Sequence, residues 1–205
     1  MEQRSAEWYA ARVGKVTASR VADLMAKTKT GYGASRGNYM AELLCERLTG
    51  EQAERFTSAE MQRGTDLEPQ ARAAYAFIHS VQVNECGFVA HPVISAFGAS
   101  PDGLIGDIGL VEIKCPNTAT HVDYLLSQTV PGKYEIQMQA QMSCTGRAWC
   151  DFVSFDPRLP DDLQLFVKRV HRDKEAIATM ENEIEDFLDE LHGKEMKLRN
   201  LAKAA

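Results

Sequence analysis

The chain has 205 residues, of which 44% are hydrophobic and 25% are charged, so it can bury a sizeable core. Its 23 Lys and Arg face 29 Asp and Glu, a net charge of −6, and no apolar run approaches the roughly 18 residues of a membrane-spanning helix. These features exclude a membrane-spanning protein. Because no signal peptide opens the chain, they also predict a cytoplasmic protein without a membrane partner.

The negative charge is concentrated near the end of the chain. Residues 173–192 hold eight acids and one lysine, so the rest of the chain carries a net charge of +1. Residues 1–47 hold eight Lys and Arg against five Asp and Glu. This part of the chain therefore favours a phosphate-binding surface.

The cysteines and histidines indicate neither a disulfide framework nor a zinc site. The five cysteines include no Cys-x-x-Cys pair, and the five histidines include no His-x-x-x-His pair. We expect reduced thiols that lie mostly in the core. His121 is expected in a solvated loop.

Helical patterns dominate residues 1–80. Thr17 or Ser19 is suited to cap a short helix that follows it. Residues 28–37 are rich in Lys, Gly and Ser and are expected to form a mobile loop. Longer helices are predicted at residues 36–48 and 58–78.

Strand patterns dominate residues 81–170, and a long helix is predicted in residues 171–205. The strands are expected at residues 81–90, 96–100, 110–115, 148–155 and 163–170, with a helix at residues 133–144. The last helix has an apolar stripe, which favours packing on its own domain over a coiled coil. We predict one α+β domain over residues 1–205, of α/β/α type, with a mixed central sheet flanked by helices.

Three residues around a buried strand predict a metal-dependent nuclease site. Glu112 and Lys114 lie two apart in the apolar strand 110–115, so both side chains point to one face. A glycine-containing hairpin of ten residues can bring Asp102 beside Glu112. Two converging carboxylates suit a hard cation, for phosphate chemistry Mg²⁺. A Glu–Lys ion pair on a solvated edge strand is the alternative.

Four ordered motifs extend this pattern. They are Trp8 to Ser19, Arg63 to Glu68, Gly98 to Leu104 with Leu110 to Pro116, and Tyr134 to Gln139 with Phe155 to Arg158. With these motifs the chain resembles the PD-(D/E)xK nuclease superfamily, and within it the lambda exonuclease family, also called YqaJ-like viral recombinases. The resemblance covers roughly residues 8 to 158.

This resemblance implies a two-ion catalytic site. Asp102 would bridge two Mg²⁺ ions, for which Mn²⁺ can substitute. Glu112 and the backbone carbonyl of Ile113 would complete one ion, and Glu68 would support the other through water. Lys114 would position the attacking hydroxide. Without the resemblance, Glu68 would be interpreted as a solvated helical charge.

The resemblance also implies sites for the end of a DNA duplex. Arg12, Ser19, Ser100 and Gln137 would bind the 5′-terminal phosphate. The alternatives are a surface ion pair for Arg12 and a solvated helix face for Gln137. Met61 corresponds to an apolar wedge between the two strands, with a helical core residue as an equal alternative. Trp8 is expected to be a core anchor for the Arg12 segment.

The implied activity is Mg²⁺-dependent, processive 5′-to-3′ digestion of linear double-stranded DNA, which leaves 3′ overhangs for single-strand annealing recombination. The family further implies a ring-shaped homotrimer, a single-strand annealing protein as partner, and a phage or prophage protein in the bacterial cytoplasm. Two alternatives stay open. One is an endonuclease or nicking enzyme of the same superfamily, and the other is a catalytically silent DNA-binding or assembly module.

Overall fold

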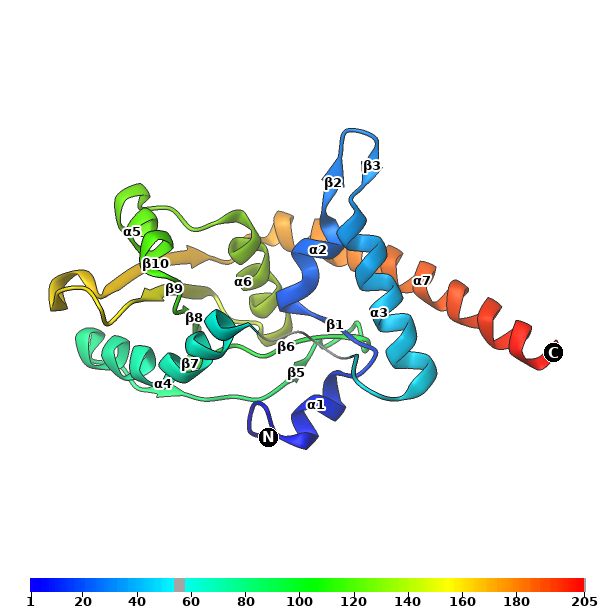
Figure 1. Ribbon diagram of the computed structural model, residues 1–205, viewed down its shortest axis with the longest axis horizontal. Helices are drawn as coiled ribbons and strands as arrows, with labels where there is room; N and C mark the ends of the chain where they lie inside the picture. Colours follow the sequence, from blue (N-terminus) through cyan, green and yellow to red (C-terminus); the bar gives the residue numbers. More distant parts are fainter. Residues whose placement is uncertain (54–57, 205) are drawn as a thin grey trace.

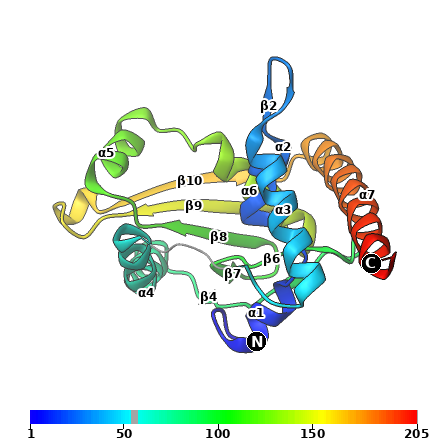
Figure 2. The same ribbon diagram turned by 45° about the vertical axis from the view of Figure 1, so that its right-hand side comes forward.

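A five-stranded mixed sheet forms the centre of the computed structural model, which describes residues 1–53 and 58–204. Its strands lie in the order β10 (Leu165–His171), β9 (Trp149–Phe155), β8 (Gly109–Lys114), β7 (Gly103–Ile105) and β4 (Val83–Asn84). Strands β8 and β9 pair in parallel and the other neighbours are antiparallel. Figure 2 shows β8, β9 and β10 side by side. The strand that was predicted to carry the site is therefore a central one.

Helices cover both faces of this sheet. Helix α4 (Ala59–His79) packs on one face through a cluster that includes Tyr75, Val111 and Val153. On the other face, α5 (Thr118–Ser127) and α6 (Gly132–Thr145) pack around Phe152. Successive side chains of β8 point to opposite faces of the sheet. Val111 lies in the cluster under α4, and Leu110 lies in the cluster that includes α6. The predicted α+β class and the α/β/α layering are confirmed.

A second, three-stranded sheet joins the N-terminal segments to this body. Strand β1 (Val16–Thr17) pairs in parallel with β6 (Phe97–Ala99), which pairs with β5 (Val89–Ala90). The elements around it are α1 (Ala6–Arg12), the 3₁₀ turn η1 (Ala18–Arg20), α2 (Val21–Met25) and α3 (Ala34–Thr49). These elements bring the Arg12 segment beside the chain that leads to Asp102.

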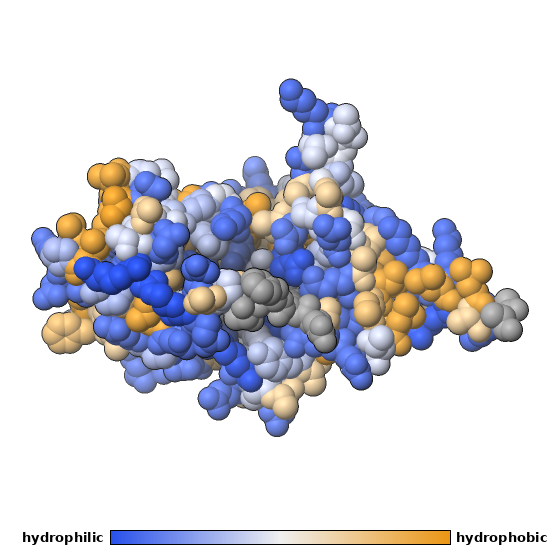
Figure 3. Space-filling view, viewed as in Figure 1, coloured by the Kyte–Doolittle hydropathy of each residue, from blue (hydrophilic) through white to orange (hydrophobic). Residues whose placement is uncertain are grey.

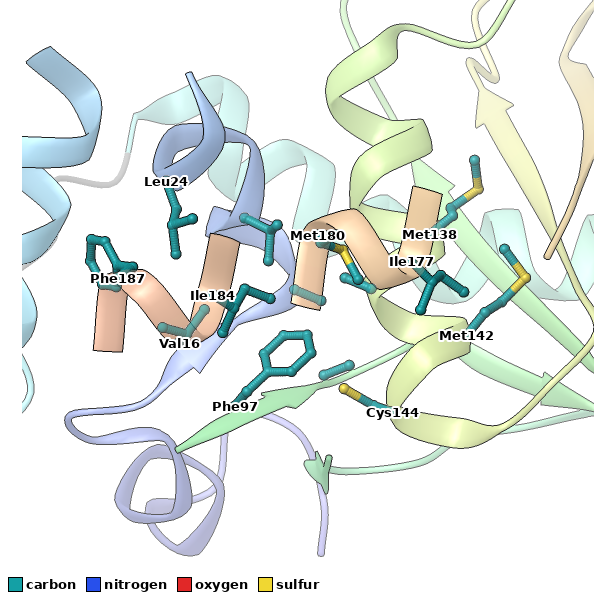
Figure 4. Close-up of a cluster of buried hydrophobic side chains, with 14 of the residues drawn as sticks. Val16, Leu24, Phe97, Met138, Met142, Cys144, Ile177, Met180, Ile184 and Phe187 are labelled. Carbon is teal, nitrogen blue, oxygen red and sulfur yellow. The ribbon is translucent and has the colours of Figure 1, made fainter. Parts of the chain in front are cut away.

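The last helix, α7 (Lys174–Ala204), packs on its own chain as predicted. Its apolar stripe is buried against α2, α3 and α6. Figure 4 shows Ile177, Met180 and Ile184 among side chains from α2, α6 and β6. The end of α7 projects beyond the body (Figure 1). None of the helices in the described part of the chain is long and apolar enough to span a membrane.

Several short elements differ from the prediction. Residues 81–90 form β4 and β5 in two different sheets, and at Gly87 between them the backbone packs directly against the carbonyl of Met1. The predicted loop 28–37 contains a hairpin of β2 (Lys27–Thr28) and β3 (Gly31–Tyr32), which projects from the body (Figure 1).

Helix boundaries differ as well. Arg20 stands at the N-cap of α2 and Thr17 at that of η1, and neither side chain makes a capping hydrogen bond. The predicted cap by Thr17 or Ser19 is therefore wrong. Helix α5 was not predicted, although Asn117 accepts a hydrogen bond from Thr120 N at its start. The turn η2 (Asp161–Leu163) replaces the beginning of the last predicted strand.

Candidate active site

The hairpin of β7 and β8 brings Asp102 and Glu112 together. Asp102 directly precedes β7, and Gly103 pairs with Val111. The Asp102 carboxylate accepts a hydrogen bond from the backbone N–H of Ile113 at 2.7 Å, which fixes it beside the residue after Glu112. Arg147 donates to the carbonyl oxygens of Gly106 and Gly109 at 2.8 and 2.6 Å and so closes the turn.

Glu112 is buried, and three donors hold it. Its carboxylate forms an ion pair with Lys114 and accepts hydrogen bonds from the amides of Gln137 at 2.6 Å and Gln141 at 2.5 Å. Its side chain is 1% exposed, so the solvated edge-strand alternative is wrong. Gln141 was missed in the sequence, where its signal is its position one helical turn after Gln137.

A cavity of about 730 Å³ lies beside these groups, between α4, β8, α5 and α6. Its lining includes Glu68, Asp102, Ile113 and Lys114. Burial and the negative charges of Glu112 and Glu68 raise the pKa of Asp102 well above its ordinary value. Burial alone would lower the pKa of Lys114, but the charges of Glu112 and Asp102 outweigh it and raise that pKa.

This donor set fits a hard divalent cation. Two carboxylates and the Ile113 carbonyl supply only oxygen ligands. Burial first, and then the charges of Glu112 and Glu68, raise the pKa of Asp102, and a cation beside it would stabilise its charged form. No three Asp, Glu, His or Cys side chains in residues 1–53 and 58–204 converge closely enough to hold an ion by themselves. An ion here would therefore also need backbone and water oxygens.

Glu68 lies on α4 and points toward the same cavity. Its two oxygens form ion pairs with Arg4 and Arg72, both at 2.7 Å. A Cβ at Gly64, one turn earlier, would lie 3.7 Å from the carbonyl oxygen of Cys115, an ordinary contact. Helix α4 thus packs against the end of β8 at ordinary van der Waals distance, and a side chain at Gly64 would not clash with it. Sequence reasoning missed Arg4, since nothing local relates it to Glu68.

Arg12 and Ser100 lie together, as predicted. The Arg12 guanidinium donates to the Ser100 hydroxyl at 3.2 Å and stacks 3.9 Å over the ring of Trp8. The Trp8 indole donates to the same hydroxyl at 2.9 Å. Trp8 therefore holds Arg12 in place. Trp8 itself is half-buried, and none of the residues of α1 is buried, so the expectation of a core residue is wrong.

Ser19 and Gln137 make other contacts. The Ser19 hydroxyl lies 3.5 Å from that of Thr17, and Gln137 binds Glu112. The solvated-face alternative for Gln137 is therefore wrong. Since η1 packs against α6, Ser19 belongs to an element beside the one that carries Gln137.

Met61 and His121 differ in exposure. Met61 is 59% exposed in the first turn of α4 and lines the cavity, so the core alternative is wrong.

His121 is 0% exposed, and its ring is hydrogen-bonded to the hydroxyl of Ser154 and the carbonyl of Leu163. The predicted solvated loop is wrong there, because residues 118–127 form a helix that buries this ring.

One buried acid joins the elements at the rim of the cavity. Asp156 accepts hydrogen bonds from Arg63 at 3.4 Å, Thr118 at 2.6 Å and Arg158 at 2.8 Å. Burial would raise the pKa of Asp156, but the hydrogen bonds from Arg158 and Thr118 and the charge of Arg158 outweigh it and lower that pKa. The network connects α4, the start of α5 and the end of β9.

Comparisons with known proteins agree with this geometry. Residues 7–148 match the model of the YqaJ-like viral recombinase domain. No curated protein matches the chain. The crystal structure of an alkaline exonuclease, LHK-Exo, from Laribacter hongkongensis is 56% identical, with a TM-score of 0.91, over 98% of this chain and 100% of that one.

Two further solved structures are similar. LHK-Exo in complex with dAMP is 56% identical, has a TM-score of 0.92 and covers 98% of this chain and 100% of that one. A phage related exonuclease from Haemophilus somnus 129PT has a TM-score of 0.71 and 16% identity over 88% of this chain and 96% of that one, which supports the fold. The sequence match over residues 7–148, with the 56% identity across nearly the whole chain, shows that this protein belongs to the YqaJ-like viral recombinase family, the lambda exonuclease family.

Proposed function

We propose that this nuclease is a Mg²⁺-dependent, processive exonuclease that digests linear double-stranded DNA from its 5′ ends and leaves 3′ single-stranded overhangs. The observation that carries the proposal is that Asp102 and Lys114 line one cavity and that the buried Glu112 forms an ion pair with Lys114. The binding of dAMP by LHK-Exo supports it, because a deoxynucleoside monophosphate is what an exonuclease releases from DNA.

Asp102, Glu112 and the Ile113 carbonyl would hold the cation, and Glu68 would support a second one through water. When bound, Mg²⁺ lowers the pKa of water and polarises the phosphate. Lys114 remains an ammonium group beside Glu112, since its pKa is raised. It would orient the attacking water and stabilise the negative charge that develops on the phosphate.

The contact of Arg12 with Ser100 supports attack at the end of a strand. A terminal phosphate carries more negative charge than an internal diester, and a guanidinium binds it through two parallel hydrogen bonds. Ser100 is two residues before Asp102, at most about 7 Å along the chain. Arg12 and Ser100, assisted by Ser19 and Gln137, would therefore hold the terminal phosphate close to the cation site.

The exposed Met61 supports separation of the strands at the mouth of the cavity. Opening one base-pair step costs about 1.4 kcal/mol of stacking, and an apolar side chain can fill the space that opens. We further propose that residues 1–205 form one nuclease domain and that the protein acts in the cytoplasm. The proposed assembly is a homotrimer that works with a single-strand annealing protein.

Digestion of a linear duplex with one 5′-phosphorylated and one 5′-hydroxyl end tests activity and direction together. We expect nucleotides to be released mainly from the phosphorylated end, and only with a divalent ion. Asp102→Ala, Glu112→Ala and Lys114→Ala should each be inactive. Near-parental turnover in any of the three would contradict the proposed site.

Arg12→Ala should lose the preference for phosphorylated ends and lower processivity, whereas Arg12→Lys should keep part of both because the charge remains. A covalently closed circular duplex is the control substrate. If the parent cuts the circle as fast as the linear duplex, the endonuclease alternative replaces the proposal.

A further inference from the structure

Residues 1–4 lie against the chain that leads to the candidate site. The Gln3 side chain donates to the backbone carbonyls of Cys86 at 2.9 Å and Pro101 at 2.8 Å, and Pro101 directly precedes Asp102. A Cβ at Gly87 would overlap the carbonyl oxygen of Met1, so the two backbones are in direct contact. The segment is therefore docked at a defined position beside the cavity.

Arg4 has a backbone conformation that is unfavourable for a residue with a side chain. Its φ of 67° lies in the left-handed region, which glycine adopts without strain and other residues rarely adopt. This turn directs the guanidinium to Glu68, where its Nη2 lies 2.7 Å from Oε2. The bonds of Gln3 and this ion pair together hold the strained turn.

The two arginines that bind Glu68 differ in how firmly they are held. Arg72 lies one turn after Glu68 on the same helix, is 14% exposed and also pairs with Glu85. Arg4 belongs to a terminal segment, is 46% exposed and has Glu68 as its ion-pair partner in the described structure. Of the two, Arg4 is the cation that can leave at the smaller cost, because an ion pair with a solvent-exposed partner contributes little to stability.

The charge of the cavity depends on Arg4. The charged residues that line it are the acids Glu60, Glu68 and Asp102 and the bases Arg4, Lys114 and Lys133. These formal charges cancel, and they still cancel when the adjoining Glu112 and Arg72 are included. With Arg4 away from Glu68 one negative charge is left over, which favours a cation at that carboxylate.

We propose that the Arg4 guanidinium occupies the place of a divalent cation at Glu68, so that Arg4 and the cation compete for this carboxylate. The inference rests on the proposed function, in which Glu68 supports a cation. It explains why Glu68 is engaged with arginines although it faces Asp102 across the same cavity. Loading of the cation therefore requires release of Arg4, and the rest of the fold stays in place.

Binding of Mn²⁺ to the whole protein without DNA tests the competition. Free Mn²⁺ is measured by electron paramagnetic resonance during titration of the parent, Arg4→Ala and Arg4→Lys. We expect Arg4→Ala to bind Mn²⁺ about three- to tenfold more tightly, since a competing positive charge is lost. Arg4→Lys should stay near the parent. Lys197→Ala, which removes the same charge from the exposed end of α7, should leave binding unchanged.

A double-mutant cycle assigns the effect to Glu68. In the Glu68→Gln background, Arg4→Ala should give no further gain, because the carboxylate for which Arg4 competes is absent. An equal gain in both backgrounds would mean that Arg4 acts only through the general field, and would overturn the competition.

A separate variant distinguishes failure of this inference from failure of the proposed function. Asp102→Asn should weaken Mn²⁺ binding strongly. If it binds like the parent, the proposed cation site is wrong. If Asp102→Asn weakens binding but Arg4→Ala equals the parent, the nuclease site stands and the competition is wrong.

Discussion

Two glutamines hold the Glu112 carboxylate without adding a positive charge beside it. Gln137 and Gln141 donate one amide hydrogen bond to each oxygen of the carboxylate, and both lie on one face of α6. An amide satisfies a buried acceptor and leaves its charge in place, whereas a second lysine or arginine would compete with a cation. The two amides thus fix the direction of the Glu112 carboxylate and bring no further cation to it.

Truncation of Gln141 should therefore be costly. Gln141→Ala leaves a buried carboxylate oxygen without its donor, and we expect the free energy of unfolding to fall by about 1–3 kcal/mol. Urea denaturation followed by circular dichroism measures the change. Gln139→Ala is the matched control, since Gln139 on the same helix bonds at the surface to the carbonyl of His171. An equal loss in both variants would contradict the role given to Gln141.

Asp102 should make the metal-free protein less stable at alkaline pH. Its folded pKa is raised by burial and by Glu112 and Glu68, so protonation favours the folded state. This contribution is complete below the unfolded pKa and is lost as the pH rises through the folded pKa. Asn at this position stays neutral and keeps an oxygen for the N–H of Ile113.

At pH 8 with EDTA, we accordingly expect Asp102→Asn to raise Tm by about 2–4 °C, the shift that 1 kcal/mol causes in a chain of this size. The difference should shrink as the pH falls, because the parent carboxyl becomes neutral too. Scanning calorimetry over the pH series measures it. A lower Tm than the parent at pH 8 would show that Asp102 is not strained by its neighbours.

At the scale of elements, side chains at the end of α3 form hydrogen bonds with the segment that follows Arg12. The buried Glu46 accepts hydrogen bonds from Gly14 N at 2.7 Å and Ala53 N at 3.1 Å. Arg47 donates to the carbonyl of Gly14 at 2.9 Å. Gly14 has a φ of +68°, and a Cβ there would lie 2.8 Å from the Arg47 side chain, so glycine is required.

Glu46→Gln should consequently loosen the Arg12 segment. One charged acceptor is replaced by a neutral amide with a single oxygen, so we expect about 1–3 kcal/mol less stability. We also expect a smaller ratio of kcat/KM between 5′-phosphorylated and 5′-hydroxyl ends. Glu51→Gln, at an exposed position just after this helix, should change neither quantity. A loss of stability with an unchanged end preference would limit Glu46 to a structural role.

The sequence predicted the long elements and the catalytic hairpin because both are local. Asp102 and Glu112 lie ten residues apart in one hairpin, and the helix stripes repeat every three or four residues. The contacts of Glu68 could not be predicted in this way, since Arg4 is 64 residues away and no periodic pattern relates the two. The same holds for His121, whose burial depends on α5 packing onto β9 and the chain before β10.

At the scale of the whole molecule, apolar side chains gather toward the projecting end of α7 (Figure 3). Met196, Leu198 and Leu201 are exposed there. The proposed ring requires a head-to-tail interface that closes after three subunits. Light scattering should therefore give a mass near three times 22.8 kDa, independent of concentration over a wide range. A stable monomer that is still processive would exclude the ring.

The walls of the cavity differ in how they are held. Strand β8 pairs with β7 and β9 and packs between helices on both faces, whereas residues 1–4 are held by the Gln3 bonds, the Arg4 ion pair and the contact of Met1 with Gly87. Backbone amides open with free energies from near zero at loosely held ends to the global value in central strands. Hydrogen–deuterium exchange should therefore take seconds at the N-terminal segment and far longer at Glu112 and Ile113. The cavity can thus open fast on one side, while Asp102 and Glu112 keep their positions on the other.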